Sequence, residues 1–356
     1  MILQRVRSEM RLRASMVRSS RGWRLGVNVA PGILVGLLLY FALRGARLDI
    51  IWHLIVQLQA RQLLAILGLD AAIFLVFGLR WWLVARVQAA GMGLADAVLV
   101  RLAAFGISYF TPGPQFGGEP LQAIYLNRRH GASIPNATAA VALDKLIELL
   151  GNYFFLVAGV AAAISSGLIP LASPVTILGV LLVAALAAWP LAHLLLLRAH
   201  VHPLSAALAR ALQDRGQRSR FVRSIRISER LMGRFCRRRP GRLMALLALS
   251  LCAGGLAVAE YALVISSFSA VLNVGQTLSA WTASWLSFLI PVPGGLGALE
   301  ASQVAALGHF GVAAEAAIGV TLLIRARDIV MGGTGMLLAA LRWQPWTSTR
   351  RQTGVC

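Results

Sequence analysis

Long apolar stretches separated by short polar segments dominate the chain. Six of them are long enough to cross a bilayer, since a span needs about 20 apolar residues. They lie at 25–43, 62–84, 134–166, 171–197, 243–272 and 312–341. The pattern predicts an all-α polytopic membrane protein. Residues 25–43 have no clear small-residue cleavage site after them, so we expect an uncleaved first helix rather than a signal peptide.

Two further stretches, 94–127 and 276–309, are each interrupted by proline and glycine. The interruptions read Phe-Thr-Pro-Gly-Pro-Gln-Phe-Gly-Gly-Glu at 110–119 and Pro-Val-Pro-Gly-Gly-Leu-Gly-Ala-Leu-Glu at 291–300. Each leaves two half-length helices, which suit a re-entrant hairpin, because irregular backbone is tolerated at membrane depth only inside protein or beside water. Pairs of full spans would put the loops on the same sides but need helices too short for the bilayer, especially 117–127. We therefore predict about six spanning helices and two re-entrant helical hairpins.

Composition supports this class and adds a topology. Hydrophobic residues make up 58% of the chain and charged residues 13%, against roughly a quarter charged in soluble domains, which excludes a soluble enzyme and a disordered chain. The net charge is +21, and arginine gathers in cytoplasmic loops. The resulting segments are a basic cytoplasmic tail at 1–24, a first membrane half at 25–197, an arginine-rich cytoplasmic loop at 198–242, a second membrane half at 243–341 and a cytoplasmic tail at 342–356.

This basic face has two possible kinds of partner. Arginine clusters beside a membrane attract anionic lipid head groups, and both termini and the loop 198–242 would face them from the cytoplasm. Binding of nucleic acid by the same loop is the weaker alternative.

The two hairpins also share a spacing. In each, a Pro-Gly pair precedes a glutamate seven residues after the proline, at Glu119 and Glu300. Charged residues recur 25 positions further on, at Asp144 in the first half and Arg325 in the second. By the predicted topology the hairpins enter from opposite sides, so the halves form an inverted repeat, which is typical of transporters with a substrate site between the repeats. Chance similarity over so short a motif is the alternative.

Charges within spans are costly and usually functional. Glu119 and Glu300 begin returning half-helices, where a carboxylate can cap the positive N-terminus or line a cavity and meet a head group or proton.

The helices that follow each hairpin carry charges of both signs. Asp144 and Glu148 share a helix face beside Lys145, and Arg325 and Asp328 share another. These charges either form ion bridges within their own helices or present cations to a phosphate, and the two roles are compatible.

Glycines at the breaks offer a further element of a site. Gly117, Gly118, Gly294 and Gly295 permit positive φ and close backbone approach, and free N–H groups at such turns can hold an anion. The alternative is that these glycines only let the chain turn. Asp70 and Glu260 are lone acids in apolar helices, with a structural role as plausible as any other. Trp81, Trp82, Trp343 and Trp346 suit the interfacial aromatic belt.

Motifs of known chemistry are missing from the sequence. It contains no GxxxxGK[ST] loop, no GxSxG and no HExxH. The three cysteines form no CxxC pair, and the six histidines are scattered. We therefore expect no cofactor, no metal and no enzymatic activity, and energy for any pumping would come from an ion gradient or a partner.

These features resemble the lysylphosphatidylglycerol synthase transmembrane-region family, also called flippase-like domain proteins. The resemblance rests on the Pro-Gly…Gly-Glu119 element with the Asp144-Lys145 helix, and on the 291–300 motif followed by Arg325. It covers about 25–341, and the first motif is similar to a hopanoid-associated branch.

The resemblance implies a lipid translocase in the bacterial inner membrane, with a lipid-synthesis enzyme as a possible partner. Known members flip aminoacylated phosphatidylglycerol that a fused soluble domain makes. This chain ends at Cys356 without room for that domain, so we do not expect lysyl-lipid synthesis. A hopanoid, a phospholipid or a lipid-linked sugar would each fit as substrate.

The main hypothesis is a flippase that works by alternating access, with Glu119, Lys145, Glu300 and Arg325 lining a central cavity. One alternative is an intramembrane transferase that uses Glu119 or Asp144 as base. Another is a scaffold that recruits lipid-modifying enzymes through the loop 198–242.

Overall fold

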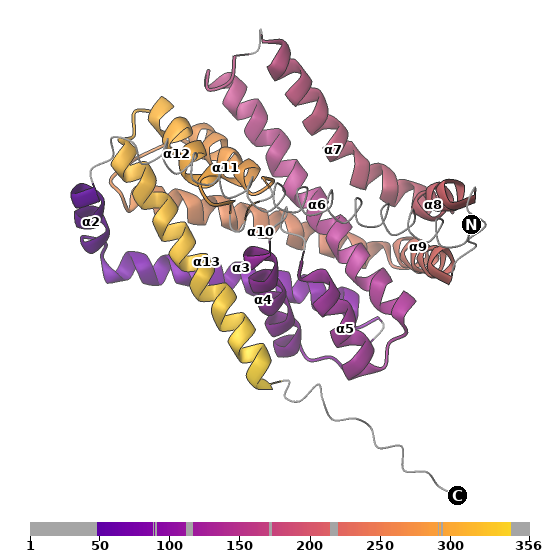
Figure 1. The fold of residues 1–356 in the computed structure, drawn as a ribbon. Helices are drawn as coiled ribbons and strands as arrows, with labels where there is room; N and C mark the ends of the chain where they lie inside the picture. Colours follow the sequence, from indigo (N-terminus) through magenta and orange to yellow (C-terminus); the bar gives the residue numbers. More distant parts are fainter. Residues whose placement is uncertain are drawn as a thin grey trace, which may run out of the picture.

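The computed structural model describes residues 48–342 apart from 88, 90, 112–116, 171–172, 214–219, 291, 293 and 294. Within that part the chain forms twelve α-helices, α2 to α13 (Figure 1). The expected first span at 25–43, the N-terminal tail, Trp343 and Trp346 lie outside the described residues. The architecture is that of a helical membrane protein, as the apolar pattern predicts.

Four helices of the described part are long and apolar enough to cross a membrane. They are α3 (Ala60–Ala85), α6 (Ile134–Ser165), α7 (Pro174–Arg198) and α10 (Pro240–Ser266). Each matches an apolar stretch of the sequence, although α10 stops six residues before 272, where a turn begins. The last helix, α13 (Ala314–Arg342), has 29 residues but carries three charges near its middle. A short helix, α2 (Leu48–Val56), precedes α3 and packs against α13.

Both interrupted stretches form pairs of short helices. The first pair is α4 (Leu94–Phe110) and α5 (Glu119–His130), and the second is α11 (Val274–Ser287) and α12 (Ala298–His309). At a rise of 1.5 Å per residue, α5 and α12 are each about 18 Å long, well short of the roughly 30 Å hydrocarbon core. Gly131 ends α5 in the left-handed region at φ 67°, which glycine adopts without strain.

The hairpins pack between the long helices at different places (Figure 1). The α11–α12 pair lies against the upper part of α6 and α13, and α4–α5 lies against their lower part, with α4 also touching α3. Helix α4 approaches α13 closely: a Cβ added to Gly106 would lie 2.4 Å from the carbonyl oxygen of Gly332. Small residues allow such close contact between helices in a membrane, where apolar surface alone gives little drive to associate.

The segment 198–242, expected as a loop, contains two helices, α8 (Pro203–Gln213) and α9 (Arg220–Arg238). Helix α9 is amphipathic, with Met232, Phe235 and Cys236 buried and Arg234 and Arg238 exposed. Burial raises the pKa of the Cys236 thiol, which suits a core residue rather than a reactive one. Glu229 accepts hydrogen bonds from the backbone N–H groups of Leu204 and Ser205, at 2.8 and 3.0 Å, and so caps the start of α8.

Trp81 corrects one prediction. Its side chain is fully buried, and it belongs to the core that α3 forms with α6 and α9, not to an interfacial belt. Trp82 is half-buried, and its indole N–H donates to the carbonyl of Met92 at 2.9 Å. The adjacent Arg80 turns inward as well, and that arginine belongs to the site described next.

Candidate functional site

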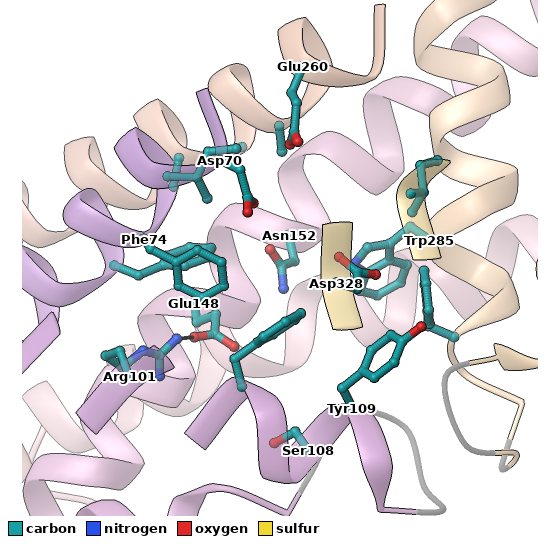
Figure 2. A pocket seen from close by; sticks show the side chains of 18 of the residues that line it. Asp70, Phe74, Arg101, Ser108, Tyr109, Glu148, Asn152, Glu260, Trp285 and Asp328 are labelled. Carbon is teal, nitrogen blue, oxygen red and sulfur yellow. Dashed lines mark hydrogen bonds and ion pairs between the residues drawn. The ribbon is translucent and has the colours of Figure 1, made fainter. Parts of the chain in front are cut away.

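A cavity of about 240 Å³ lies between the two hairpins and the helices α3, α6, α10 and α13 (Figure 2). Charged side chains gather in two groups around it, and aromatic side chains cover much of the remaining wall. The aromatic lining residues are Phe74, Phe77, Phe105, Tyr109, Tyr261, Trp281, Trp285 and Phe288. A wall of this kind suits an amphiphile that has a polar part and an apolar part.

The first charge cluster joins α3, α4, α5 and α6. It consists of Arg80, Arg101, Glu119, Asp144, Lys145 and Glu148. Its three cations match its three carboxylates, so the cluster is formally neutral. Neutrality lets these groups stay charged away from water, provided that the pairs are also well hydrogen-bonded.

The arginines bind both acids of α6. Arg80 donates to Asp144 at 2.8 Å and to Glu148 at 2.6 Å, and Arg101 reaches the same two carboxylates at 3.2 and 2.6 Å. Arg80 is 1% exposed, and it also donates to the hydroxyl of Ser250 at 3.1 Å. The planar, multidentate guanidinium suits such a buried bridge between helices.

Lys145 connects this network to the first hairpin. Its ammonium lies 3.0 Å from a carboxylate oxygen of Glu119 and 2.8 Å from Glu148. The contact with Glu148 is a bridge within α6, one of the two roles that the sequence left open for these charges. The one with Glu119 ties α5 to α6. Both partners line the cavity, with side chains 18% and 23% exposed, so a bound molecule can reach them.

The second charge cluster consists of Asp70, Glu260, Glu300, Arg325, Arg327 and Asp328. Arg325 donates to both oxygens of Glu300, at 2.5 and 2.9 Å, and to the carbonyl of Gly295 at 3.1 Å. This bidentate pair ties the second hairpin to α13. Neither Arg325 nor Glu300 is among the residues that line the cavity.

Arg327 holds the other acids of this cluster. It contacts Glu260 at 2.5 Å, Asp328 at 2.7 Å and Asp70 at 4.0 Å. Asp70 and Glu260, which the sequence left as lone acids, therefore meet around one guanidinium. The cluster has four carboxylates and two cations, a formal charge of −2.

The hairpin turns use their glycines and glutamates together. Glu119 accepts from the N–H of Gly117 at 2.9 Å, and Glu300 accepts from the N–H of Gly297 at 2.9 Å. Each glutamate thus caps its own turn and also forms an ion pair. The N–H of Gly118 donates to the hydroxyl of Ser108 at 2.9 Å. The N–H groups of Gly117 and Gly118 thus have hydrogen-bond partners within the hairpin, and they do not need a bound anion as partner.

The predicted site residues divide by their relation to the cavity. Those that line it are Glu119, Lys145, Glu148, Gly295 and Asp328. Those placed behind its wall are Gly117, Gly118, Asp144, Glu300 and Arg325. Gly294 lies outside the described residues.

Arg101 and Arg80 are the functional candidates that the sequence interpretation missed. Arg101 is a lone cation within an apolar half-helix, and a charge in such a place needs a partner. The position of Arg101 in the sequence could therefore have identified it as a candidate. Arg80, beside two tryptophans, instead had the pattern of a membrane-interface residue.

A model of the family described as the lysylphosphatidylglycerol synthase TM region matches residues 27–334. The matched range includes both hairpins and both charge clusters. No curated protein matches the sequence.

Proposed function

Because the chain belongs to the family of the lysylphosphatidylglycerol synthase TM region, membrane domains associated with flippase-like function, we propose that it is a lipid translocase. It moves a polar or amphiphilic lipid across the bacterial inner membrane by alternating access, with both termini in the cytoplasm. The observation that carries this proposal is the cavity that both hairpins line. The ion pair between Glu119 and Lys145 lies in its wall and is partly exposed.

The cavity suits a head group rather than a whole lipid. Its volume of about 240 Å³ lies below the roughly 300–1,000 Å³ of pockets that enclose drug-sized ligands. A phospholipid's acyl chains therefore stay in the bilayer while the head group enters. Lys145 and Arg101 supply donors to a phosphate, and charge-assisted hydrogen bonds of this kind are strong. For a hopanoid without a phosphate, Glu119 and Glu148 would accept hydrogen bonds from its hydroxyl groups.

Alternating access follows from the correspondence between the hairpins. The pairs Glu119–Lys145 and Glu300–Arg325 join equivalent parts of the two halves, and we infer that the halves are inverted repeats. Only the first pair lines the cavity. In the opposite state the second pair would open and the first would close, as expected of transporters with a site between inverted repeats.

Anionic lipids are proposed as partners at the cytoplasmic face. A cleft there is lined by Trp82, Arg86, Arg239 and Arg242, with the Arg86 guanidinium 4.5 Å from the centre of the Trp82 ring. Within the described residues these arginines have no acidic partner, and basic clefts between membrane helices suit anionic head groups. A lipid-synthesis enzyme on the same side would supply the substrate.

The test is translocation in proteoliposomes with head-group-labelled lipids of several classes and a membrane-impermeant quencher. The isosteric change Glu119→Gln removes the carboxylate's charge, and we expect translocation to fall about tenfold or more, the range of one lost charged contact. Asp96→Asn is the matched control, because Asp96 pairs with Arg342 outside the cavity, at 3.0 Å. Equal rates for wild type and Glu119→Gln would contradict the site assignment.

A further inference from the structure

The second charge cluster holds more negative charge than its cations can balance. Arg325 is engaged by Glu300 and the carbonyl of Gly295. Arg327 is therefore left to serve three carboxylates, those of Asp70, Glu260 and Asp328. Like charges held this close in a poorly hydrated site cannot all stay ionised at low energetic cost, and binding a proton relieves the repulsion.

Asp70 is the least satisfied of the three acids. It is 5% exposed, and its Oδ2 atom has no hydrogen-bond partner within the described residues. Its Oδ1 atom lies 4.0 Å from the Arg327 Nε atom, whereas Glu260 and Asp328 lie within 2.7 Å of the same guanidinium. Figure 2 shows the Asp70 carboxylate directed into the cavity near Glu260. A buried oxygen so placed is an open position for a proton.

From this geometry we propose that Asp70 takes up and releases one proton in each transport cycle, so that lipid translocation is coupled to a proton gradient. The proposal rests on the proposed function and names its energy source. A proton from water on one side forms the O–H bond at Asp70 Oδ2. The same bond breaks on the other side and returns the proton to water, and no bond of the lipid changes.

Arg327 converts this exchange into movement. While Asp70 is protonated and neutral, the guanidinium stays with Glu260 on α10 and Asp328 on α13. When Asp70 loses its proton, its charge draws Arg327 toward α3 and weakens the contact with α10. The three helices meet at this guanidinium, so one proton biases how they pack. A bound ligand or proton can shift an equilibrium only by such differential contacts.

The proton site and the lipid site lie at separate places along the same cavity. Asp70 and Arg80 are ten residues apart on α3, as are Ser250 and Glu260 on α10, and ten residues span about 15 Å. The charged groups that face Asp70 are Glu260 from α10, and Arg327 and Asp328 from α13. The charged groups that α4 and α6 present to the cavity, Arg101, Lys145 and Glu148, belong to the first cluster.

A proton fits the position better than a metal ion. Within the described residues no group of three His, Cys, Asp or Glu side chains is arranged to hold a metal.

The first experiment reads the proton site without any lipid transport. Infrared spectra of the reconstituted full chain are recorded between about pH 5 and pH 9, where buried carboxyl groups titrate. We expect the band of a protonated carboxyl in wild type, lost as the pH rises, absent in Asp70→Asn and retained in Asp70→Glu. Asp96→Asn should titrate like wild type. No titrating band in wild type, or an unchanged band in Asp70→Asn, would overturn the proposal.

The second experiment measures coupling. An imposed pH gradient should make wild-type proteoliposomes accumulate labelled lipid in one leaflet, whereas Asp70→Asn should only equilibrate it. Wild type that equilibrates lipid regardless of the gradient would overturn the coupling but not the flippase. Wild type that moves no lipid while Asp70 titrates would overturn the coupling together with the proposed function. Accumulation driven by a sodium gradient at constant pH would assign the position to sodium instead of a proton.

Discussion

The two charge clusters perform related tasks in different ways. Each ties a hairpin to a long helix through a glutamate and a cation, Glu119 with Lys145 and Glu300 with Arg325. The first pair has side chains 23% and 18% exposed and lines the cavity, while the second has side chains 5% and 10% exposed and lies behind its wall. A lysine can exchange partners through three rotatable donors, whereas a bidentate arginine is fixed in one geometry. In this state of the cavity the first pair is therefore the one that can open, and the second is held closed.

The largest expected effect is the loss of stability when the ion pair between Glu300 and Arg325 is broken. Arg325→Ala leaves Glu300 buried without its cation, which costs about 3–5 kcal/mol for a buried pair. We expect a clear fall in the thermal unfolding temperature of the detergent-solubilised protein. Lys145→Ala should cost less, because Glu148 keeps Arg80 and Arg101 and Glu119 is partly exposed. Equal losses for the two variants would remove the contrast between the clusters.

Glycine substitutions at the two turns compare the stability of the two hairpins directly. A Cβ at Gly118 would lie 2.2 Å from the carbonyl oxygen of Ala104, which is backbone and cannot turn aside. Gly118→Ala should therefore destabilise the first hairpin by about 1–3 kcal/mol, the range of overpacking. At Gly295 the φ of 61° is the main obstacle, and Gly295→Ala should cost roughly 1–2 kcal/mol. Unfolding temperatures measure both.

Gly255→Ala is the control for this pair, since nothing lies within 4 Å of its added Cβ. It should match or exceed wild-type stability, because alanine favours a helix by up to about 1 kcal/mol over glycine. A Gly118→Ala protein as stable as this control would show that the first hairpin does not depend on the close approach.

Most of the helical architecture was predictable, because it depends on residues that are close together in the sequence. Helices α3, α6 and α7 follow long, predominantly apolar stretches of the sequence. The breaks that separate α4 from α5 and α11 from α12 follow from proline and glycine. The ion pairs were not predictable in the same way, since Arg80 and Asp144 are 64 residues apart and Arg327 and Glu260 are 67 apart. No periodicity encodes which helices face each other. The role of these residues in substrate binding stays a prediction.

The substitution Lys145→Arg tests whether the ion pair between Glu119 and Lys145 must open during transport. The charge is kept, but a planar guanidinium can fork onto Glu119 and Glu148 and hold them as Arg325 holds Glu300. We expect normal stability and a several-fold slower translocation, a change of about 1 kcal/mol. The proteoliposome assay measures it, and Lys145→Ala run in parallel separates lost charge from added rigidity. A wild-type rate in Lys145→Arg would mean that exchange of partners at this position does not limit transport.

The smallest effect should come from an ion pair outside both clusters. Asp96 and Arg342 lie 3.0 Å apart with side chains 28% and 56% exposed, and exposed pairs contribute about 0–1 kcal/mol. Asp96→Asn should leave the unfolding temperature and the translocation rate near wild type, while Glu300→Gln, with the same loss of one negative charge, lowers stability. Added salt should narrow the remaining difference for Asp96 but hardly alter that for Glu300, because screening acts mainly on exposed charges. If both variants lost the same stability, burial could not explain why the second hairpin is held more tightly than the first.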